Sequence, residues 1–285
     1  MYAVVKLKKW LVLGLAAAVV MAGLAAGVGL ASSSARVFKG VRLPVVMYHK
    51  VSESRADWNR YCISAAEFES DLQYIAAAGY TTIVIRDLID YVEKGTPLPE
   101  RPIMLTFDDG NIDNYTLVLP LLKKYNMKIV FAPYGKIVDA CTADNDRNPH
   151  TAAVSWNDIA EMAQSGLVEV QNHSYDLHQG IGSKRKAGES MDAYTVRLTA
   201  DTEKMQALIR QYAGAAPTAY VYPFGAFSKG ELGILQGMGF SCTLGCYEVA
   251  NDITRDPACL FDLGRFRRPH GVSSTVFLGQ KLGVT

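Results

Sequence analysis

Two adjacent carboxylates follow a largely apolar run in the middle of the chain. Residues 103–107 read Ile-Met-Leu-Thr-Phe, and Asp108, Asp109 and Gly110 come next. A run of this length that ends at a glycine is typical of a buried strand in a parallel sheet, and polar groups at the carboxyl end of such a strand are well placed for chemistry. Neighbouring carboxylates repel unless a cation or a hydrogen bond compensates. We interpret the pair as one metal-binding aspartate and one general base, and a solvated turn is the alternative.

Two of the five histidines come directly after a second short apolar run, residues 167–170. His173 and His178 are five residues apart, a spacing that does not place them on one face of a helix and that puts them on opposite faces of a strand. They can converge only through a turn that follows the strand. With Asp109 at another strand end, they predict a metal site of two histidines and one aspartate that keeps open positions for water and substrate.

Residues 106–110 (TFDDG) and 173–178 (HSYDLH) resemble the first two motifs of the polysaccharide deacetylases, carbohydrate esterase family four. The five-residue histidine spacing and an early Tyr48-His49 pair are similar to those of exported poly-N-acetylglucosamine deacetylases. The likeness covers residues 43–277. It implies a distorted (β/α) barrel of about seven parallel strands, with the site at the carboxyl ends of the strands.

The resemblance implies hydrolysis of an acetamide, namely removal of acetyl groups from an N-acetylglucosamine-containing extracellular polysaccharide or cell-wall glycan. Asp109, His173 and His178 would hold one divalent metal ion, most simply Zn²⁺, with Ni²⁺, Co²⁺ or Fe²⁺ as alternatives. Asp108 would be the general base. A xylan acetyl esterase, another C–N hydrolase of the same fold and a glycan-binding protein without activity remain alternative functions.

The third motif of the family corresponds to Tyr222, Pro223 and Phe224, which the resemblance assigns to substrate binding. It also assigns the backbone N–H of Phe224 to stabilising the oxyanion of the reaction.

The family arginine that usually precedes the third motif is absent, because residues 219–222 read Ala-Tyr-Val-Tyr. The group that orients Asp108 therefore stays open. Arg265, Arg267 or Arg268 is a candidate, although solvated surface positions are expected for at least two of the three.

Two histidines are candidates for the acid that protonates the leaving amine. His49 ends the apolar run 45–48, which would aim it at the same sheet edge as the metal ligands, and the resemblance supports an acid near the N-terminus in a circularly permuted branch. His270 is the alternative acid, but Pro269 and Gly271 on either side of it indicate an exposed turn. His150 is expected to have no part in the site.

The first 35 residues are expected to be an export segment. Three lysines precede an uncharged stretch, residues 10–34, that is longer than a usual signal-peptide core and close to the ~20 residues that span a bilayer. An uncleaved anchor is favoured and a cleaved signal peptide is the alternative. Residues 36–43 are predicted to be a linker and residues 44–285 the catalytic domain, on the extracellular face of the membrane or secreted.

Strands alternate with helices over the rest of the chain, which indicates a mostly parallel sheet with right-handed crossovers. Strands are predicted at residues 44–48, 81–85, 103–107, 128–132, 167–170, 219–222, 241–244 and 260–266. Helices are predicted after the capping residue Ser64, through Leu88 to about Gly95, up to Tyr125, and over residues 155–166, 191–212 and 228–236. Residues 139–151 show no periodicity and are expected to form a long loop. The pattern alone leaves a closed barrel and an open sheet both possible.

Composition narrows the class of protein further. A chain of 285 residues with 49% hydrophobic residues can bury one large core, so a single catalytic domain is sufficient. The net charge of +1 and the lack of a basic run interleaved with aromatic residues argue against a nucleic-acid partner. The five cysteines are an odd number, and no disulfide pairing is predicted.

Overall fold

The computed structural model describes residues 40–285. The predicted export segment and the start of the linker lie outside these residues. Within residues 40–285, no helix has the length and apolar character needed to cross a membrane. The end of the predicted linker is wrong, because Val41–Leu43 form strand β1, which pairs antiparallel with β11 (Asn251–Ile253).

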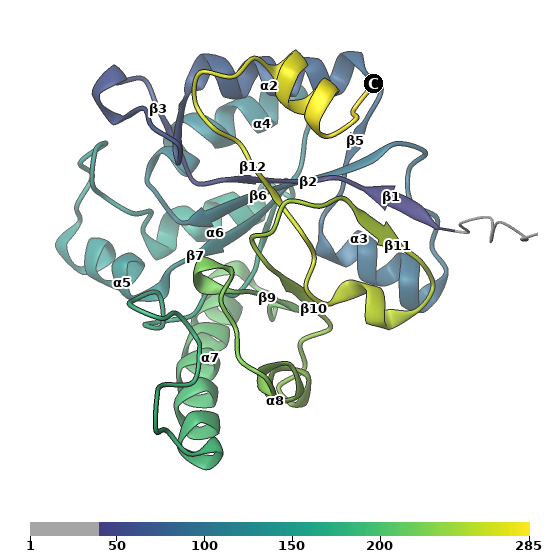
Figure 1. Ribbon diagram of the computed structural model, residues 1–285. Coiled ribbons are helices and arrows are strands. Elements are labelled where there is room, and N and C mark those ends of the chain that lie inside the picture. Colours follow the sequence, from purple (N-terminus) through teal and green to yellow (C-terminus); the bar gives the residue numbers. More distant parts are fainter. Residues whose placement is uncertain (1–39) are drawn as a thin grey trace, which may run out of the picture. The chain divides into compact units, whose positions relative to one another are not determined.

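A parallel sheet runs through the centre of the fold (Figure 1). Its order is β12 (Phe266–Arg267), β2 (Val45–Tyr48), β6 (Pro102–Asp109), β7 (Ile129–Pro133) and β8 (Val168–Val170), and β5 (Thr81–Thr82) pairs with the start of β6. Every pairing among these strands is parallel. Their carboxyl ends therefore meet at one edge, as the sequence predicted.

A second parallel pair continues this arrangement. Strand β9 (Ala219–Val221) pairs with β10 (Cys242–Leu244). Single parallel bridges connect Asn172, after β8, to Tyr220 and Leu244 to Leu263. Parallel contacts thus run from β8 through β9 and β10 to the segment that becomes β12, so residues near 265 lie beside the first central strand.

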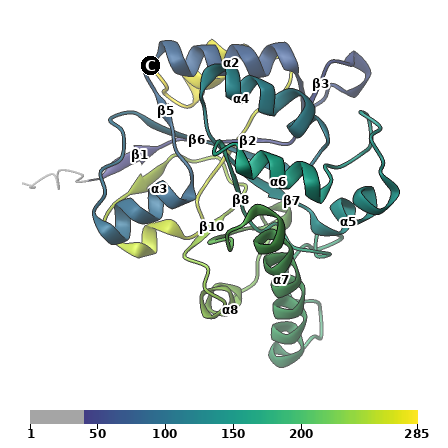
Figure 2. The ribbon, with the colours of Figure 1, turned by 180° about the vertical axis from the view of Figure 1, so that it is seen from behind.

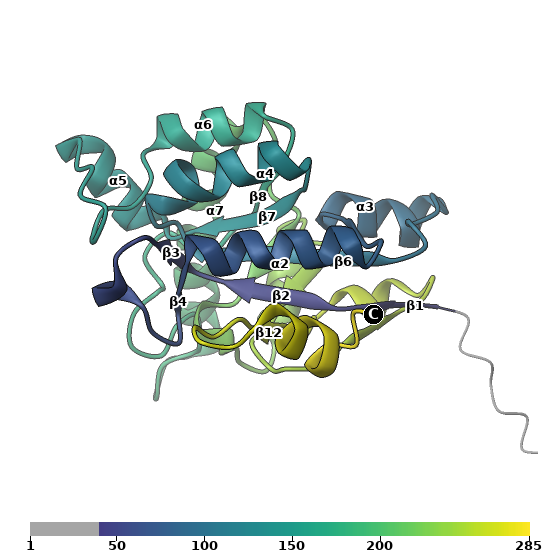
Figure 3. The ribbon, with the colours of Figure 1, turned by 90° about the horizontal axis from the view of Figure 1, so that it is seen from above.

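Helices cover the outer face of the central strands. They are α2 (Ala65–Ala77), α3 (Ile85–Ile89), α4 (Leu119–Tyr125), α5 (Gly135–Asp144), α6 (Trp156–Gln164), α7 (Met191–Ala213) and α8 (Glu231–Gly237). Seen from above, α2, α4 and α6 lie in a row over β2, β6 and β7 (Figure 3). From behind, α7 follows next to α6 (Figure 2).

Shorter elements complete the chain. They are β3 (Lys50–Ser52), β4 (Cys62–Ser64), 3₁₀ turns at Arg55–Asp57, Pro223–Gly225 and Pro257–Leu260, and π-helical turns at Asp90–Lys94, Asn114–Val118 and Thr275–Lys281. The predicted capping box is present, since the Ser64 hydroxyl accepts from Glu67 N–H while the Glu67 carboxylate accepts from Ser64 N–H.

Side chains along β6 point alternately to the outer core and to the inside of the sheet. Leu105 and Phe107 face outward and pack with the helices in one core cluster, whereas Met104 faces inward and packs with residues of β7, β9 and β10 in another. Side chains two residues apart share a face of a strand. Thr106 and Asp108 therefore point to the inside with Met104.

Two predicted segments differ in the structure. Helix α5 covers the first half of the predicted loop 139–151, because Val138 is buried and Asp139 accepts hydrogen bonds from the Trp156 indole and the Tyr175 hydroxyl. The last predicted strand, 260–266, is interrupted: a 3₁₀ turn covers Pro257–Leu260, Asp262 has a left-handed φ of 59°, and β12 is only Phe266–Arg267. The long-range contacts of Asp139 are not visible in local periodicity.

Candidate functional site

Backbone conformation turns the first motif toward the mouth of the sheet. Asp109 has a φ of 70° and Gly110 a φ of 87°, both in the left-handed region. That region is costly for side chains other than glycine. A Cβ atom at Gly110 would come within 2.9 Å of Pro133 Cβ, so glycine is required there for space as well. The strain at Asp109 indicates a position held for function.

The two histidines converge on Asp109 through the turn that the sequence requires. Ser174 has a φ of 68°, which reverses the chain between His173 and His178. The Nε2 atoms of His173 and His178 lie 3.6 Å and 3.2 Å from Asp109 Oδ1. One ligand atom from each of the three residues lies within 4.8 Å of the other two. The structure thus brings the predicted triad together.

This donor set fits a divalent metal ion. Oδ1 of Asp109 is buried and has no well-aligned hydrogen-bond donor within residues 40–285. His173 Nδ1 lies 2.7 Å from the carbonyl oxygen of Val221, which can only accept, so Nδ1 carries the proton and Nε2 offers its lone pair to the site. Two imidazole nitrogens and one carboxylate oxygen are a ligand set that zinc takes, with positions left for other ligands.

The pKa shifts of Asp109, His173 and His178 also favour binding of a cation. Burial alone would raise the pKa of Asp109, but the adjacent His173 and the charges of His49 and His178 hold it well below its usual range. Burial and the neighbouring His173 lower the pKa of His178. The pKa of His173 is raised despite its burial, because Asp109 and Asp108 favour positive charge at that point. The negative charges of Asp108 and Asp109 would also attract a divalent cation.

Asp108 is held in place by an arginine from the end of the chain. Arg265 Nη1 lies 2.8 Å from Asp108 Oδ1 and 3.2 Å from Thr106 Oγ1, and its Nε donates to Gly245 O at 2.7 Å. Both charged side chains are buried. Burial would raise the pKa of Asp108, but the charges of Arg265 and His173 lower it below its usual value. The carboxylate is therefore ionised and has one fixed orientation.

The expectation that at least two of the three late arginines are solvated surface residues is wrong. Arg265 and Arg268 are both buried, and Arg268 pairs with Asp71 at 2.7 Å. Arg265 and Arg267 have the same parity as Leu263, whose side chain belongs to the inner core, but the sequence alone does not show which parity faces inward.

A cavity of about 640 Å³ opens over the triad. Its lining combines the two aspartates and three histidines with aromatic, sulfur-containing and charged side chains, namely Met47, His49, Tyr61, Asp108, Asp109, His173, His178, Phe224, Cys246, Glu248 and Arg267. The sequence analysis did not single out Met47, Tyr61, Cys246 or Glu248. All five cysteines are free in the structure.

The two candidate acids lie in different places. His49 lines the cavity, its Nδ1 is buried with no hydrogen-bond partner in the described part of the chain, and burial lowers its pKa. His270 is not among the lining residues; its Nδ1 lies 2.7 Å from Glu67 Oε2, and its ring packs against Trp58. His150 is exposed and contacts Asp57, away from the site. Geometry thus favours His49 over His270.

The third motif contributes one residue to the cavity rather than three. Phe224 has a left-handed φ of 59°, is 53% exposed, and its ring centroid lies 4.4 Å from that of His178. Tyr222 and Pro223 are buried and do not line the cavity; Tyr222 stacks on Phe227 instead. The structure therefore does not place Tyr222 and Pro223 at the cavity surface. They support the turn that carries Phe224.

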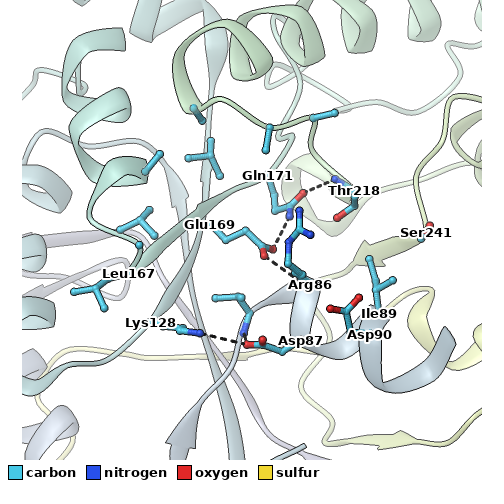
Figure 4. Close-up of a pocket in the computed structure, with 18 of the residues that line it drawn as sticks. Arg86, Asp87, Ile89, Asp90, Lys128, Leu167, Glu169, Gln171, Thr218 and Ser241 are labelled. Carbon is cyan, nitrogen blue, oxygen red and sulfur yellow. Dashed lines mark hydrogen bonds and ion pairs between the residues drawn. The ribbon is translucent and has the colours of Figure 1, made fainter. Parts of the chain in front are cut away.

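A second cavity, of about 510 Å³, lies at the amino ends of the strands (Figure 4). Its charged groups are largely satisfied by one another. Glu169 accepts from the Gln171 amide and from Arg86 N–H, and Lys128 lies 3.9 Å from Asp87. None of its lining residues is a histidine or cysteine. This cavity has no group suited to the chemistry of the first.

The chain is similar to proteins of a known family. Residues 95–243, just over half of the chain, match the polysaccharide deacetylase family. Over 218 residues the chain is 26% identical to the poly-beta-1,6-N-acetyl-D-glucosamine N-deacetylase of Escherichia coli K12, an alignment that covers 68% of this chain and 32% of that protein. The chain therefore spans about a third of the length of that relative.

Solved structures agree on the fold. A de-N-acetylase from Aggregatibacter actinomycetemcomitans superposes with a TM-score of 0.69 and 27% identity, covering 80% of this chain and 95% of that one. IcaB from Ammonifex degensii superposes with a TM-score of 0.67 and 25% identity, covering 86% and 97%. The α/β architecture with parallel strands is thus shared with deacetylases of the (β/α)-barrel type.

Proposed function

The chain belongs to the polysaccharide deacetylase family, and we propose on that basis that it removes N-acetyl groups from an N-acetylglucosamine-containing extracellular polysaccharide or cell-wall glycan. The observation that carries the proposal is the buried Asp108–Arg265 pair beside the cluster of Asp109, His173 and His178. An oriented carboxylate next to three metal-type ligands is suited to hydrolysis of an amide.

Asp109, His173 and His178 would hold one divalent metal ion, most simply Zn²⁺, with Ni²⁺, Co²⁺ or Fe²⁺ as alternatives. When bound, such an ion supplies Lewis-acid polarisation and makes water nucleophilic near neutral pH. The protein contributes the geometry, because the Val221 carbonyl fixes the orientation of His173 and the left-handed turn fixes Asp109.

Asp108 would act as the general base, since it is ionised, inward-facing and fixed by Arg265. His49 would donate a proton to the amine that leaves, because it lines the same cavity and its ring is not engaged by another side chain through hydrogen bonds within residues 40–285. The backbone N–H of Phe224 would stabilise the oxyanion. The left-handed backbone at Phe224, unfavourable for a bulky residue, supports such a constrained role.

The substrate class rests on the relatives, whose names specify poly-beta-1,6-N-acetyl-D-glucosamine. An export segment at residues 1–35, as the sequence predicts, would agree with a substrate outside the cell, whether the segment anchors the enzyme to the membrane or is cleaved as a signal peptide. The barrel would count seven strands, with residues 263–267 joining β10 to β2.

Release of acetate is the direct test. Purified protein would be incubated with poly-N-acetylglucosamine, peptidoglycan, chitin and acetylated xylan, each with and without a chelator. We expect acetate from an N-acetylated glycan, loss of release with chelator and recovery when Zn²⁺ is restored. Release from acetylated xylan alone would identify an esterase, and binding without any acetate release would identify a glycan-binding protein.

A further inference from the structure

Arg267 is the one arginine of the late cluster whose charge has no partner within residues 40–285. Arg265 pairs with Asp108 and Arg268 pairs with Asp71, whereas no carboxylate lies within ion-pair distance of Arg267. Its Nε is buried and has no acceptor in the same part of the chain. A buried donor without an acceptor is costly, and Arg267 lines the cavity over the metal-type ligands. The Arg267 guanidinium therefore has donors left for a ligand in the cavity.

An aromatic ring lies directly under this guanidinium. The Arg267 guanidinium carbon is 5.2 Å from the centre of the Tyr61 ring, and that ring centre is 5.1 Å from the His49 ring. Tyr61 also lines the cavity and is 41% exposed. Tyr61 and Arg267 thus form a shelf beside His49 in the cavity wall. The exposed part of the Tyr61 ring can pack against the apolar face of a sugar.

The charge on this shelf is positive. The only carboxylate in the cavity lining apart from the two motif aspartates is Glu248. Its Oε2 lies 2.7 Å from Lys281 Nζ, and its Oε1 accepts from the backbone N–H of Arg267. Glu248 is therefore compensated by Lys281, while the guanidinium of Arg267 is not compensated.

We propose that Tyr61 and Arg267 form a subsite for the sugar next to the one being deacetylated, an inference that rests on the proposed function. The Arg267 guanidinium donates to an oxygen of that sugar, a hydroxyl or an acetamide carbonyl. The positive charge disfavours a neighbouring sugar that has already lost its acetyl group, because its amine is an ammonium ion at neutral pH. The subsite would spread deacetylation along the glycan rather than cluster it.

The test uses two short N-acetylglucosamine oligomers that differ at one position. In the first every sugar is acetylated, and in the second the sugar next to the reacting one carries a free amine. For the wild-type protein we expect kcat/KM to be about 3- to 10-fold higher on the first oligomer at low salt, with the ratio shrinking in ~0.5 M salt as the charges are screened. Mass spectrometry would locate the deacetylated sugar.

Three variants separate charge from hydrogen bonding. Arg267→Gln should bring the ratio close to 1. Arg267→Lys should keep most of the ratio but raise KM, because lysine keeps the charge and loses the planar Nε donor. Arg60→Gln is the matched control, since Arg60 lies 4.8 Å from the centre of the same Tyr61 ring but does not line the cavity, and it should behave as wild type. Metal content and thermal stability verify folding.

Binding of the same two oligomers to chelator-treated protein gives a readout that does not depend on turnover. The fully acetylated oligomer should bind more tightly to wild type and equally with the other to Arg267→Gln. Absence of acetate release by wild type would refute the proposed function and leave this binding comparison to decide the subsite. Equal binding and equal rates for the two oligomers with wild type, or an unchanged ratio in Arg267→Gln, would overturn the subsite.

Discussion

Arg265 and Asp108 lie 157 residues apart in the sequence and 2.8 Å apart in the structure, where both are buried. The arginine also donates to Gly245 O and Thr106 Oγ1, so its position is set by two segments, β6 and the loop after β10. A carboxylate held in this way is ionised and aimed, which are the two properties that a general base requires.

The first prediction concerns this positioning. Arg265→Lys keeps a positive charge but cannot reach all of these acceptors, so Asp108 should lose its fixed orientation and turnover should fall about 10- to 100-fold. Metal content should be unchanged, because Arg265 contacts none of the three ligands. Steady-state rates and metal analysis would check this, with Arg86→Lys at the second cavity as control. A variant with wild-type turnover would contradict the role of Arg265.

Asp108 itself should be needed for rate and not for metal. Asp108→Asn preserves size and one acceptor oxygen but cannot take a proton, so we expect turnover to fall about 10²- to 10⁴-fold with metal retained. Metal analysis alongside acetate release measures both. Equal loss of metal and activity would mean that the roles of Asp108 and Asp109 are exchanged.

Removal of a metal ligand should abolish metal and activity together. In His178→Ala the remaining Asp109 and His173 are two ligands, too few for a stable site. Metal stoichiometry and acetate release should fall in parallel, whereas His150→Ala, on the exposed loop, should match wild type in both. Full metal occupancy with normal turnover in His178→Ala would refute the site.

His49 and His270 should behave differently on substitution. His49→Ala should keep the metal, lose most turnover and lose the limb of the pH–rate profile that falls as pH rises, since a general acid works only while protonated. Burial lowers the pKa of His49, so that limb should lie below the range of an exposed histidine. His270→Ala should leave the profile unchanged and lower only thermal stability, through the lost contact with Glu67. The reverse pattern would make His270 the acid.

Asp113 should make stability depend on pH. Burial raises the pKa of Asp113 to about 7, although Val51 N–H donates to its carboxylate. The native state therefore holds a proton that the unfolded chain releases near pH 4, and this contribution to stability falls as pH rises from about 4 to 7.

Asp113→Asn removes that titration. Relative to wild type, the variant should gain roughly 2 kcal/mol in free energy of unfolding between pH 5 and pH 7. Urea unfolding at both pH values measures the difference, with Asp252→Asn on the exposed side of β11 as control. A wild-type and variant difference that does not change with pH would show that Asp113 is ionised throughout.

The local sequence pattern was sufficient to predict the strands and the turn that carry Asp109, His173 and His178. The apolar runs before Asp108 and His173 are β6 and β8, and the turn demanded by the spacing of His173 and His178 is present at Ser174. These features depend on neighbours in sequence, which is why one sequence was enough.

Contacts between distant segments could not be predicted in the same way. Helix α5 forms where a loop was expected, because Asp139 is bonded by Trp156 and Tyr175. The choice of Arg265 over its two neighbours depends on how residues 263–267 lie between β10 and β2, a question of sheet order that local periodicity does not address. Tertiary context decided both cases.

The pairing of β12 with β2 bears on the stage of folding at which the protein can become active. Strand β2, near the start of the described chain, pairs with β12, near its end. The segment that leads into β12 also places Arg265 beside Asp108. Contacts this distant in sequence form slowly, because the entropy of closing the loop must be overcome before they stabilise anything. A chain that lacks this pairing would also lack the arginine that orients Asp108. We therefore expect catalytic competence to require that β12 pair with β2.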